Sequence, residues 1–305
     1  MSSRTRGLPS CEKPWAELPE GSAHGVFGAD DVLGTLNRQS PETVLGALSA
    51  AVMGRVFSLN LPLDQPEPAL FQRQFPRHRV FTTPRGNLDD VVDNFYPQSS
   101  SQWDGFLHVP DPELGFYNGL GRDEHGVHHW ASRGIVGRGV VLDISEAIAA
   151  AGSDAFASRT PVDVEALEAV RRAAGVEYRR GDILVVRTGW ISWFREQDAE
   201  SRARVRDSRA APGLEGSAAM AEYLWDHGFI AVASDSPGVE ALPSSAGSLH
   251  HRVLARLGMP LGELWWLDDL AADCAADGRH EAMVVSSPMN LVGGVGSPAN
   301  AIAIR

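Results

Sequence analysis

Lysine and cysteine are almost missing from the sequence. Lys13 is the only lysine among 305 residues, and the two cysteines, Cys11 and Cys274, lie far apart and outside any CxxC pattern. A disulfide framework or a cysteine-rich zinc site is therefore not expected, and two free thiols are the simpler interpretation. The preference for arginine over lysine indicates codon bias rather than chemistry.

Long apolar runs and an excess of positive charge are also lacking. No stretch of about 18 consecutive apolar residues occurs, so no membrane-spanning helix is expected. The first residues, MSSRTRGLPSCEKPW, lack the apolar core of a secretory signal, which favours a cytoplasmic protein. The chain has 27 basic and 39 acidic residues and a net charge of −12. An acidic surface repels phosphate backbones, so nucleic acid is not expected as a partner.

What the sequence does contain is typical of an α/β protein. Its hydrophobic fraction of 43% and charged fraction of 22% are those of an ordinary globular chain with a large core. Short runs rich in valine and isoleucine alternate with helix-like periods, and residues 139–144, 183–187 and 229–233 are expected as buried strands. No repeat or composition shift marks a boundary. We therefore expect one α/β domain, residues 28–305, preceded by an N-terminal arm, residues 1–27.

Helices are expected between and before these strands. One is predicted over residues 41–53, with Ser40 as N-cap and a proline in its first turn. Residues 161–174 carry acidic side chains early and arginines late, as the helix dipole favours. Two more are predicted over residues 214–227 and 250–257, each followed by a glycine.

The segment of residues 61–106 is different from the rest of the chain. It holds six prolines and few clear periods, so we expect irregular structure, which inside a compact domain is often functional. A basic run that includes Arg73 and Arg85 is interpreted as a solvated loop, given the overall negative charge. Residues 293–298, GGVGSP, predict a tight loop before a final strand.

A first candidate site lies at the end of this segment. If the chain is extended there, Gln98, Gln102, Asp104 and His108 have the same parity and project to one face, with Trp103 on the other. Aspartate and histidine are common metal ligands, and glutamine offers a carbonyl oxygen. An Asp-x-x-x-His pair alone is more often structural, so the pattern needs partners from elsewhere in the chain.

A second candidate group follows far downstream. His250 and His251 begin a predicted helix, and Glu263 follows in GELWWLDDL. One histidine and this carboxylate could complete a metal shell. The alternatives are a pair of surface histidines and a glutamate that stabilises the start of the next helix.

Ordered blocks along the chain resemble the cyclase-type metal-dependent hydrolases. They include GADDVLGTLNRQSPETV from Gly28, SQWDGFLHV, GIVGRGVVLDI, GDILVVRTGW and the final SPMNLVGGVGSPANAIAIR. This family includes bacterial kynurenine formamidase and isatin hydrolase, and its longer-chain branch resembles the trans-dienelactone hydrolases. The resemblance implies a swivelling β/β/α fold with mixed sheets, a homodimer or homotetramer, and a small-molecule substrate.

The family motif HxGTHxDxPxH implies a set of metal ligands. The first two histidines of the motif fall on Gln98 and Gln102, and its aspartate and last histidine are retained. The family also has a histidine and a glutamate further along the chain, twelve residues apart, and both are retained here. The retained ligands are Asp104, His108, His251 and Glu263. The resemblance therefore implies a single divalent metal, Zn²⁺ or Mn²⁺, with help from Gln102, rather than a two-metal site.

The implied reaction is hydrolysis by metal-activated water. A bound ion lowers the pKa of water to roughly 7 and polarises a carbonyl, so that an amide, imide, lactone or ester of a small cyclic or aryl substrate opens. The general base is left open between His250, His128 and Glu263. No GxSxG motif indicates a serine nucleophile instead.

Further residues are candidates for binding the substrate. They are Gln98, Trp103, Tyr117, Asn118, Arg138 and Asp235. Arg138 could bind a carboxylate or pair with an acidic neighbour. Asp235 follows a predicted strand, where active sites of α/β folds gather, but a turn or cap role is the alternative.

Two other functions stay open. The same Lewis acid could activate a carbonyl for attack by an internal nucleophile, as in a cyclase or dehydratase of secondary metabolism. Alternatively, the two glutamines could mark a non-catalytic member that binds a small ligand.

Overall fold

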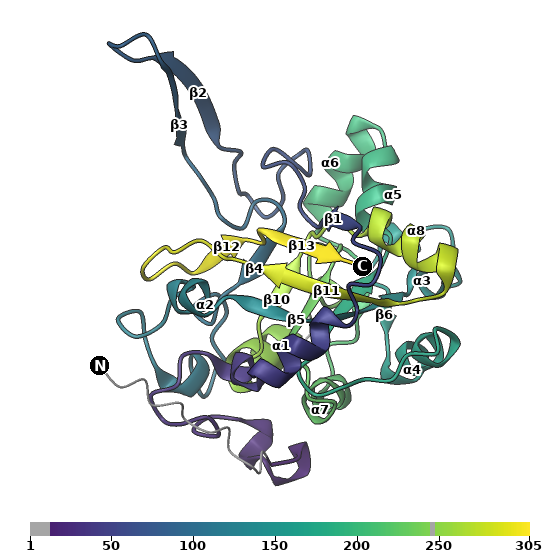
Figure 1. The fold of residues 1–305 in the computed structure, drawn as a ribbon. Coiled ribbons are helices and arrows are strands. Elements are labelled where there is room, and N and C mark those ends of the chain that lie inside the picture. Colours follow the sequence, from purple (N-terminus) through teal and green to yellow (C-terminus); the bar gives the residue numbers. More distant parts are fainter. Residues whose placement is uncertain (1–12, 245–247) are drawn as a thin grey trace.

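A mixed sheet carries the fold (Figure 1). The computed structural model describes residues 13–244 and 248–305. Within them the sheet has nine strands in the order β1-β13-β11-β5-β7-β9-β10-β4-β12, and its central strands β5, β7, β9 and β10 run parallel. The strands are β1 (Val56–Ser58), β4 (Gln102–Asp104), β5 (Ile135–Asp143), β7 (Ile183–Arg187), β9 (Ala231–Ser234), β10 (Leu261–Glu263), β11 (Glu281–Ser286), β12 (Gly296–Pro298) and β13 (Ala301–Ile304).

Helices and two small ribbons complete the architecture. The ribbons pair β2 (Arg77–Thr82) with β3 (Leu88–Asp93) and β6 (Pro161–Val162) with β8 (Gly213–Leu214). The helices are α1 (Pro41–Leu48), α2 (His128–Arg133), α3 (Ser145–Ala149), α4 (Val164–Ala173), α5 (Trp190–Glu196), α6 (Ala199–Ser208), α7 (Ala218–Asp226), a π-helix (His250–Arg256) and α8 (Asp268–Asp277). Short 3₁₀ turns lie at Trp15–Glu17, Pro19–Gly21, Gly34–Arg38, Tyr117–Gly119 and Ala155–Ala157.

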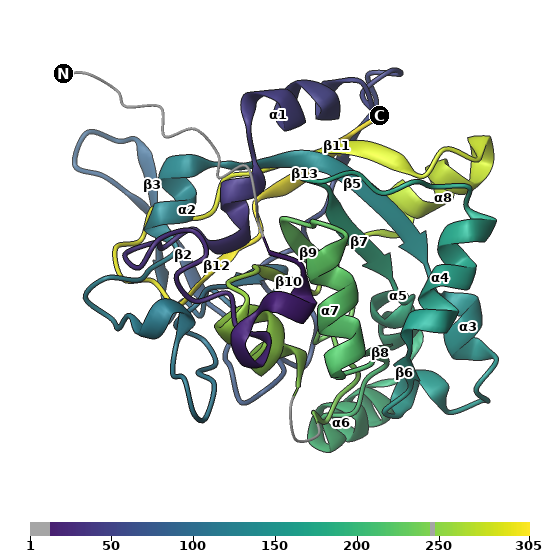
Figure 2. The same cartoon turned by 90° about the horizontal axis from the view of Figure 1, so that it is seen from below.

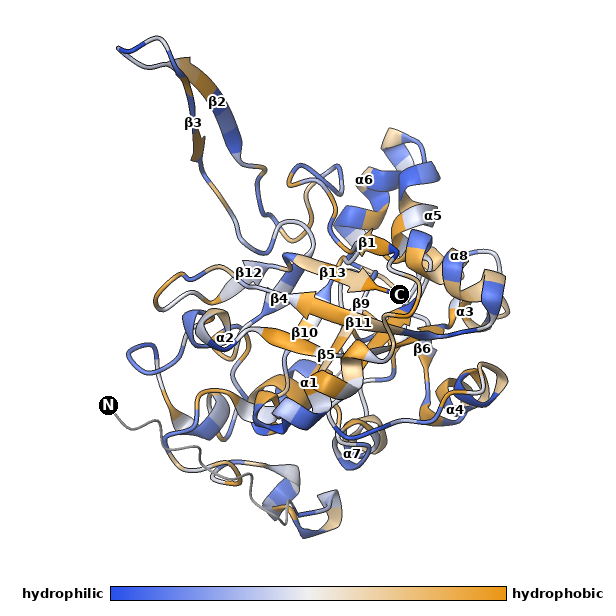
Figure 3. Ribbon diagram, in the orientation of Figure 1, coloured by the Kyte–Doolittle hydropathy of each residue, from blue (hydrophilic) through white to orange (hydrophobic). Residues whose placement is uncertain are grey.

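The central strands are buried because helices cover both faces of the sheet. Figure 2 shows α1 above β5 and β11, and α4 and α7 on the opposite side. Parallel strands in this position need apolar side chains in continuous runs, and every residue of β9 is buried. The same strands appear as hydrophobic segments in Figure 3. The predicted α/β class with a mixed sheet is therefore confirmed.

The three predicted strands and four predicted helices are found, with shifted ends. β7 has the predicted bounds, and Ser40 forms a capping box with Thr43 at the start of α1, which ends at Leu48. The predictions of helix over residues 161–163 and 214–217 are wrong. Those residues include β6 and β8, which pair in parallel before Asp163 and Ser217 cap the helices that follow.

The prediction of irregular structure over residues 61–106 is wrong for β2, β3 and β4. β2 and β3 form a hairpin that projects from the body of the molecule, as Figure 1 shows, and every residue of β2 is exposed. A ribbon exposed on both faces needs no alternation of apolar and polar residues, so its sequence lacked the strand pattern. β4, with only three residues, is too short to show one.

The N-terminal residues that the structure describes pack against α7. The backbone N–H of Trp15 donates to Asp226 Oδ1 at 2.7 Å, and the indole of Trp225 donates to the carbonyl of Lys13 at 2.9 Å. Residues 1–12 of the predicted arm lie outside the described residues. No helix in the described ranges is long and apolar enough to cross a membrane.

Arg138 ties β5 to its surroundings through a buried cluster of charges. Its guanidinium donates to both carboxylate oxygens of Asp182, at 2.9 and 2.6 Å, and Nη1 lies 2.8 Å from Glu281 Oε1. Only 3% of the Arg138 side chain is exposed, and its guanidinium pairs with acidic neighbours, the alternative that the sequence left open. Burial lowers the pKa of Arg138, but Asp182 and Glu281 outweigh it and raise that pKa.

Removing this guanidinium should therefore destabilise the fold. We expect Arg138→Ala to lower the free energy of unfolding by about 3–5 kcal/mol, because it leaves Asp182 buried and unpaired. Arg204→Ala is the control, since Arg204 pairs with Glu200 on an exposed helix turn and should matter by less than about 1 kcal/mol. Urea unfolding measures both; equal stabilities would contradict the structural role.

Candidate metal centre

Strand β4 presents two polar side chains to one face of the sheet. Gln102 and Asp104 alternate with Trp103, so they share a face, as predicted from their parity. Trp103 is completely buried on the other side, where its indole donates to Ser286 Oγ at 2.9 Å and packs edge-on against Trp265. In the antiparallel pairing with β10, Glu263 lies directly opposite Gln102. The strand pairing therefore brings Glu263 beside the β4 residues.

A tight turn after β4 returns His108 to Asp104. The backbone N–H of His108 donates to Gly105 O at 2.9 Å, and His108 Nε2 lies 3.6 Å from Asp104 Oδ2. Gly105 packs so closely that a Cβ there would lie 2.5 Å from Val295 O. Only glycine fits at this point of the turn.

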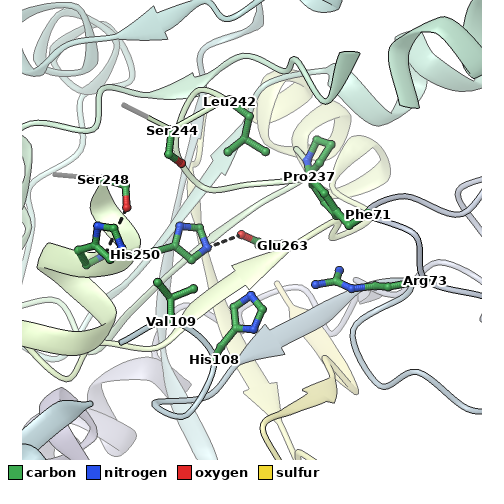
Figure 4. Close-up of a pocket in the computed structure, with 11 residues that line it drawn as sticks. Phe71, Arg73, His108, Val109, Pro237, Leu242, Ser244, Ser248, His250 and Glu263 are labelled. Carbon is green, nitrogen blue, oxygen red and sulfur yellow. Dashed lines mark hydrogen bonds and ion pairs between the residues drawn. The ribbon is translucent and has the colours of Figure 1, made fainter. Parts of the chain in front are cut away.

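His250 enters the same cluster from the π-helix. Its Nε2 lies 3.4 Å from Asp104 Oδ2 and 3.2 Å from Glu263 Oε1, as Figure 4 shows for Glu263. Its Nδ1 lies 2.6 Å from Glu240 Oε1, and the other Glu240 oxygen accepts from the N–H of Leu249 at 2.6 Å. Glu240 thereby fixes the ring orientation that turns Nε2 to the cluster.

The amide nitrogens of the two glutamines face the two carboxylates. Gln98 Nε2 donates to Asp104 Oδ1, and Gln102 Nε2 donates to Glu263 Oε2 at 2.6 Å. Gln102 Oε1, the atom that could bind a metal, accepts from Arg73 Nη1 at 3.3 Å. Arginine only donates and an ionised carboxylate only accepts, so these partners fix which way the Gln102 amide points.

The carboxylates of Asp104 and Glu263 each have one oxygen that no hydrogen bond from the described residues occupies. Asp104 Oδ2 and Glu263 Oε1 are buried and have no hydrogen-bond partner among the described residues. Both face the Nε2 atom of His250, at the distances given above. Two atoms bound to one tetrahedral ion at about 2.0–2.2 Å are separated by about 3.3–3.6 Å, close to the separations of Asp104 Oδ2 from His108 and His250. Asp104, His108 and His250 have ligand atoms that all lie within 4.8 Å of one another and so could hold a divalent cation, with Glu263 Oε1 next to His250 as a further oxygen.

The electrostatics of the cluster favour a cation. Burial would raise the pKa of Asp104, but His108, His250 and Arg73 lower it to about 2. Burial, and then the charge of Asp104, raise the pKa of Glu263. Burial would lower the pKa of His250, but the neighbouring carboxylates of Asp104, Glu240 and Glu263 raise it well above the usual value. The carboxylate of Asp104 therefore stays ionised and available to a cation.

The structure brings His250 rather than His251 into this cluster. His251 lies on the wall of the adjoining pocket, and its backbone N–H donates to Ser248 Oγ at 3.4 Å. Thirteen residues separate His250 from Glu263, one more than the spacing that pointed to His251. The π-helix takes more residues per turn than an α-helix and so accommodates the extra residue.

Tyr117, Asn118 and His128 lie away from the cluster. The hydroxyl of Tyr117 donates to Asp31 Oδ2 at 3.1 Å, and the amide of Asn118 donates to the carbonyls of Gly28 and Asp31. His128 begins α2, and its Nδ1 accepts from a backbone N–H in the loop before β12 at 3.3 Å. All three make contacts that tie loops together.

Asp235 lies at the end of β9 but faces backbone. One oxygen accepts from the N–H and hydroxyl of Thr188, at 2.6 and 2.7 Å, and the other from the N–H of Gly189 at 2.8 Å. Burial raises the pKa of Asp235 to about 6, although Thr188, Arg187 and Gly189 favour the ionised form. The aspartate anchors the turn that follows β7.

A pocket of about 300 Å³ opens onto the cluster (Figure 4). Its lining residues are Phe71, Arg73, His108, Val109, Pro237, Leu242, Ser244, Ser248, His250, His251 and Glu263. Sequence reasoning missed two functional candidates, Glu240 and Arg73. Glu240 lies six residues beyond the end of β9, and its position after a parallel strand is a signal that could have identified it. Nothing in the sequence around Arg73 distinguished it from a solvated arginine.

Comparisons with known proteins show the family to which the chain belongs. Residues 57–241 match the model of the Cyclase family, described as "Putative cyclase". A crystal structure of "a novel cyclase" is 28% identical and has a TM-score of 0.84 over 97% of this chain and 100% of that one. The chain therefore belongs to the Cyclase family, and the resemblance stated from the sequence is confirmed. No curated protein sequence matches the chain.

More distant structures share the fold. Isatin hydrolase A from Labrenzia aggregata, bound to benzyl benzoate, is 18% identical with a TM-score of 0.58, covering 86% of this chain and 97% of that one. Isatin hydrolase A from Ralstonia solanacearum is 17% identical with the same TM-score of 0.58, covering 87% and 98%. At these identities the likeness concerns the fold.

The Asp235 contacts generate a test of its role. Asp235→Asn places an amide N–H against a backbone N–H, so we expect a loss of about 1–3 kcal/mol in the free energy of unfolding. Asp64→Asn, at an exposed position, serves as the matched control and should leave stability unchanged. Urea denaturation is the measurement. Full stability in the Asp235 variant would count against the anchoring role and leave Asp235 free to contact substrate.

Proposed function

We propose that the protein is a metal-dependent hydrolase that opens an ester, lactone, amide or imide of a small cyclic or aryl substrate. The observation that carries this proposal is the pair of buried oxygens, Asp104 Oδ2 and Glu263 Oε1, that lack hydrogen-bond partners and face two imidazoles beside a pocket. Buried carboxylate oxygens are normally hydrogen-bonded, so two such atoms together indicate a ligand with positive charge.

A divalent cation bound there would lower the pKa of water to about 7 and polarise a substrate carbonyl. Two imidazole nitrogens and two carboxylate oxygens suit Zn²⁺, and the oxygen share also suits Mn²⁺. The four residues that would hold the cation are Asp104, His108, His250 and Glu263.

Residues around these four orient the ligand atoms. Glu240 keeps His250 Nδ1 engaged, so that Nε2 stays directed to the cluster. Gln98 and Gln102 each occupy one oxygen of a carboxylate and leave the other for the cation. In this proposal the glutamines support a single-metal site.

The shared fold supports hydrolysis as the reaction class. Two of the fold relatives are named isatin hydrolases, and one more isatin hydrolase structure contains the product analogue thioisatinate. A pocket of about 300 Å³ has room for a substrate of small size. We therefore propose cyclic and aryl compounds as the first substrates to test.

Cyclisation is the second candidate reaction. The relative with 28% identity is described as a novel cyclase, which favours keeping this alternative. The same cation and pocket could activate a carbonyl for attack from within the substrate. Hydrolysis consumes water and cyclisation does not, so the fate of solvent oxygen separates them.

The metal-ligand assignment predicts a difference between two neighbouring histidines. We expect His250→Ala to weaken Zn²⁺ or Mn²⁺ binding at least about 100-fold, because it removes a ligand, and His251→Ala to weaken it by less than about threefold. Elemental analysis and calorimetric titration measure the two variants against the wild type. The opposite ranking would return the ligand role to His251. A wild type that binds neither metal would overturn the metalloenzyme proposal.

The reaction class predicts where solvent oxygen goes. The metal-loaded protein, screened against lactones, cyclic imides and aryl formamides in ¹⁸O-labelled water, should place one labelled oxygen in each new carboxylate. Mass spectrometry of the product reads this directly, and Asp104→Asn provides the inactive control. Turnover to an unlabelled, cyclised product would establish the second candidate instead.

A further inference from the structure

We propose that the pocket takes a substrate carrying an anionic group, and that Arg73 binds this group. The inference rests on the proposed function, because it names the substrate class of that same pocket. It is carried by the position of the Arg73 guanidinium, the apolar lining around it and two further arginines beside it.

The Arg73 guanidinium is held at the pocket by one of its nitrogens. Nη1 donates to the carbonyl of Gln98 and to Gln102 Oε1, the latter at 3.3 Å. Nε and Nη2 have no hydrogen-bond or ion-pair partner among the described residues, and Figure 4 shows the side chain reaching into the pocket from the side opposite His250. A fixed guanidinium with free donors is suited to the two oxygens of a carboxylate.

Outside the candidate metal centre, Arg73 is the main source of positive charge in the pocket. Arg73 is the only arginine or lysine among its lining residues, and much of the wall is apolar, formed by Phe71, Val109, Pro237 and Leu242. A cation in the metal centre would neutralise Asp104 and Glu263, which leaves the Arg73 charge facing the substrate. The apolar wall suits the neutral body of an aryl or cyclic acid.

A basic surface continues outward from Arg73. Arg73 and Phe71 also line a neighbouring hollow of about 380 Å³, together with Arg206 and Arg209. Arg206 pairs with Asp207 at 2.7 Å, so part of its charge is balanced locally. On a chain with a net charge of −12, this hollow is lined by three arginines and one aspartate, a local excess of positive charge. Such a patch concentrates anions at the mouth of a site.

The backbone that carries Arg73 is conformationally unusual. Phe71 and Gln72 have φ angles of 55° and 63°, in the left-handed region that non-glycine residues rarely adopt. Consecutive residues of this kind persist where the surrounding structure enforces them, often at ligand sites. Here they turn Phe71 and Arg73 to the same pocket.

Binding of a matched pair of ligands tests the proposal. Benzoate and benzamide share size and shape and differ in charge, and both are titrated calorimetrically into the Zn²⁺-loaded protein near neutral pH. We expect benzoate to bind at least about tenfold more tightly than benzamide, and Arg73→Gln to weaken benzoate about 10- to 100-fold and benzamide less than about threefold. Arg85→Gln, an exposed arginine in the turn of the β2–β3 hairpin, should change neither.

Two results would overturn the proposal. Equal affinities for benzoate and benzamide would show that the pocket does not select charge. Undiminished benzoate binding in Arg73→Gln would place the anion on the metal instead. If Arg73→Gln loses its zinc, Arg73→Lys replaces it in the test, because lysine keeps the charge but lacks the planar guanidinium. We then expect the affinity for benzoate to fall and the affinity for benzamide to stay the same. An equal loss of affinity for both ligands would contradict the role of Arg73.

Failure here is distinguishable from failure of the proposed function. The two probes bind without turnover, so Arg73-dependent benzoate binding in a protein that hydrolyses nothing would leave this inference standing. Conversely, metal-dependent hydrolysis of neutral lactones without any preference for benzoate would support the proposed hydrolase activity and reject the proposal of an anionic substrate.

Discussion

The convergence of Asp104 and Glu263 on His250 is the constraint on which the rest of the site depends. Two carboxylates buried side by side repel each other, and each leaves one oxygen without a hydrogen bond. The amides of Gln98 and Gln102 donate to the other oxygen of Asp104 and of Glu263. Glu240 orients the His250 imidazole that lies between the two carboxylates. This geometry suits a positive charge at the centre of the cluster.

The sequence was sufficient for the fold class and for much of the candidate site. Buried parallel strands are short apolar runs, and for that reason β7 could be predicted to the residue. Asp104, His108 and Glu263 were also predicted as ligands, and the structure brings them together. The parity of β4 correctly placed Gln102 and Asp104 on one face, because strand side chains alternate whatever the tertiary context.

What could not be predicted depends on contacts across the chain. Glu240 and Arg73 become relevant only once the sheet and the loops place them beside His250 and Gln102. The choice between His250 and His251 depends on a π-helix, which hydrophobic periodicity does not reveal. From the sequence, the two glutamines are weak metal-ligand candidates through their carbonyl oxygens. In the structure their amide nitrogens face carboxylates, and the direction of each amide depends on hydrogen-bond partners that the sequence does not reveal.

The pairing of β4 has a consequence for how the protein is made. β4 lies between β10 and β12, and β1 pairs with β13, so β1 and β4 pair with strands that are synthesised much later. During translation the ligand-bearing strand emerges long before either neighbour. The nascent chain therefore exposes unpaired strand edges until β10, β12 and β13 have emerged, and the candidate metal centre forms only after β10 has joined β4.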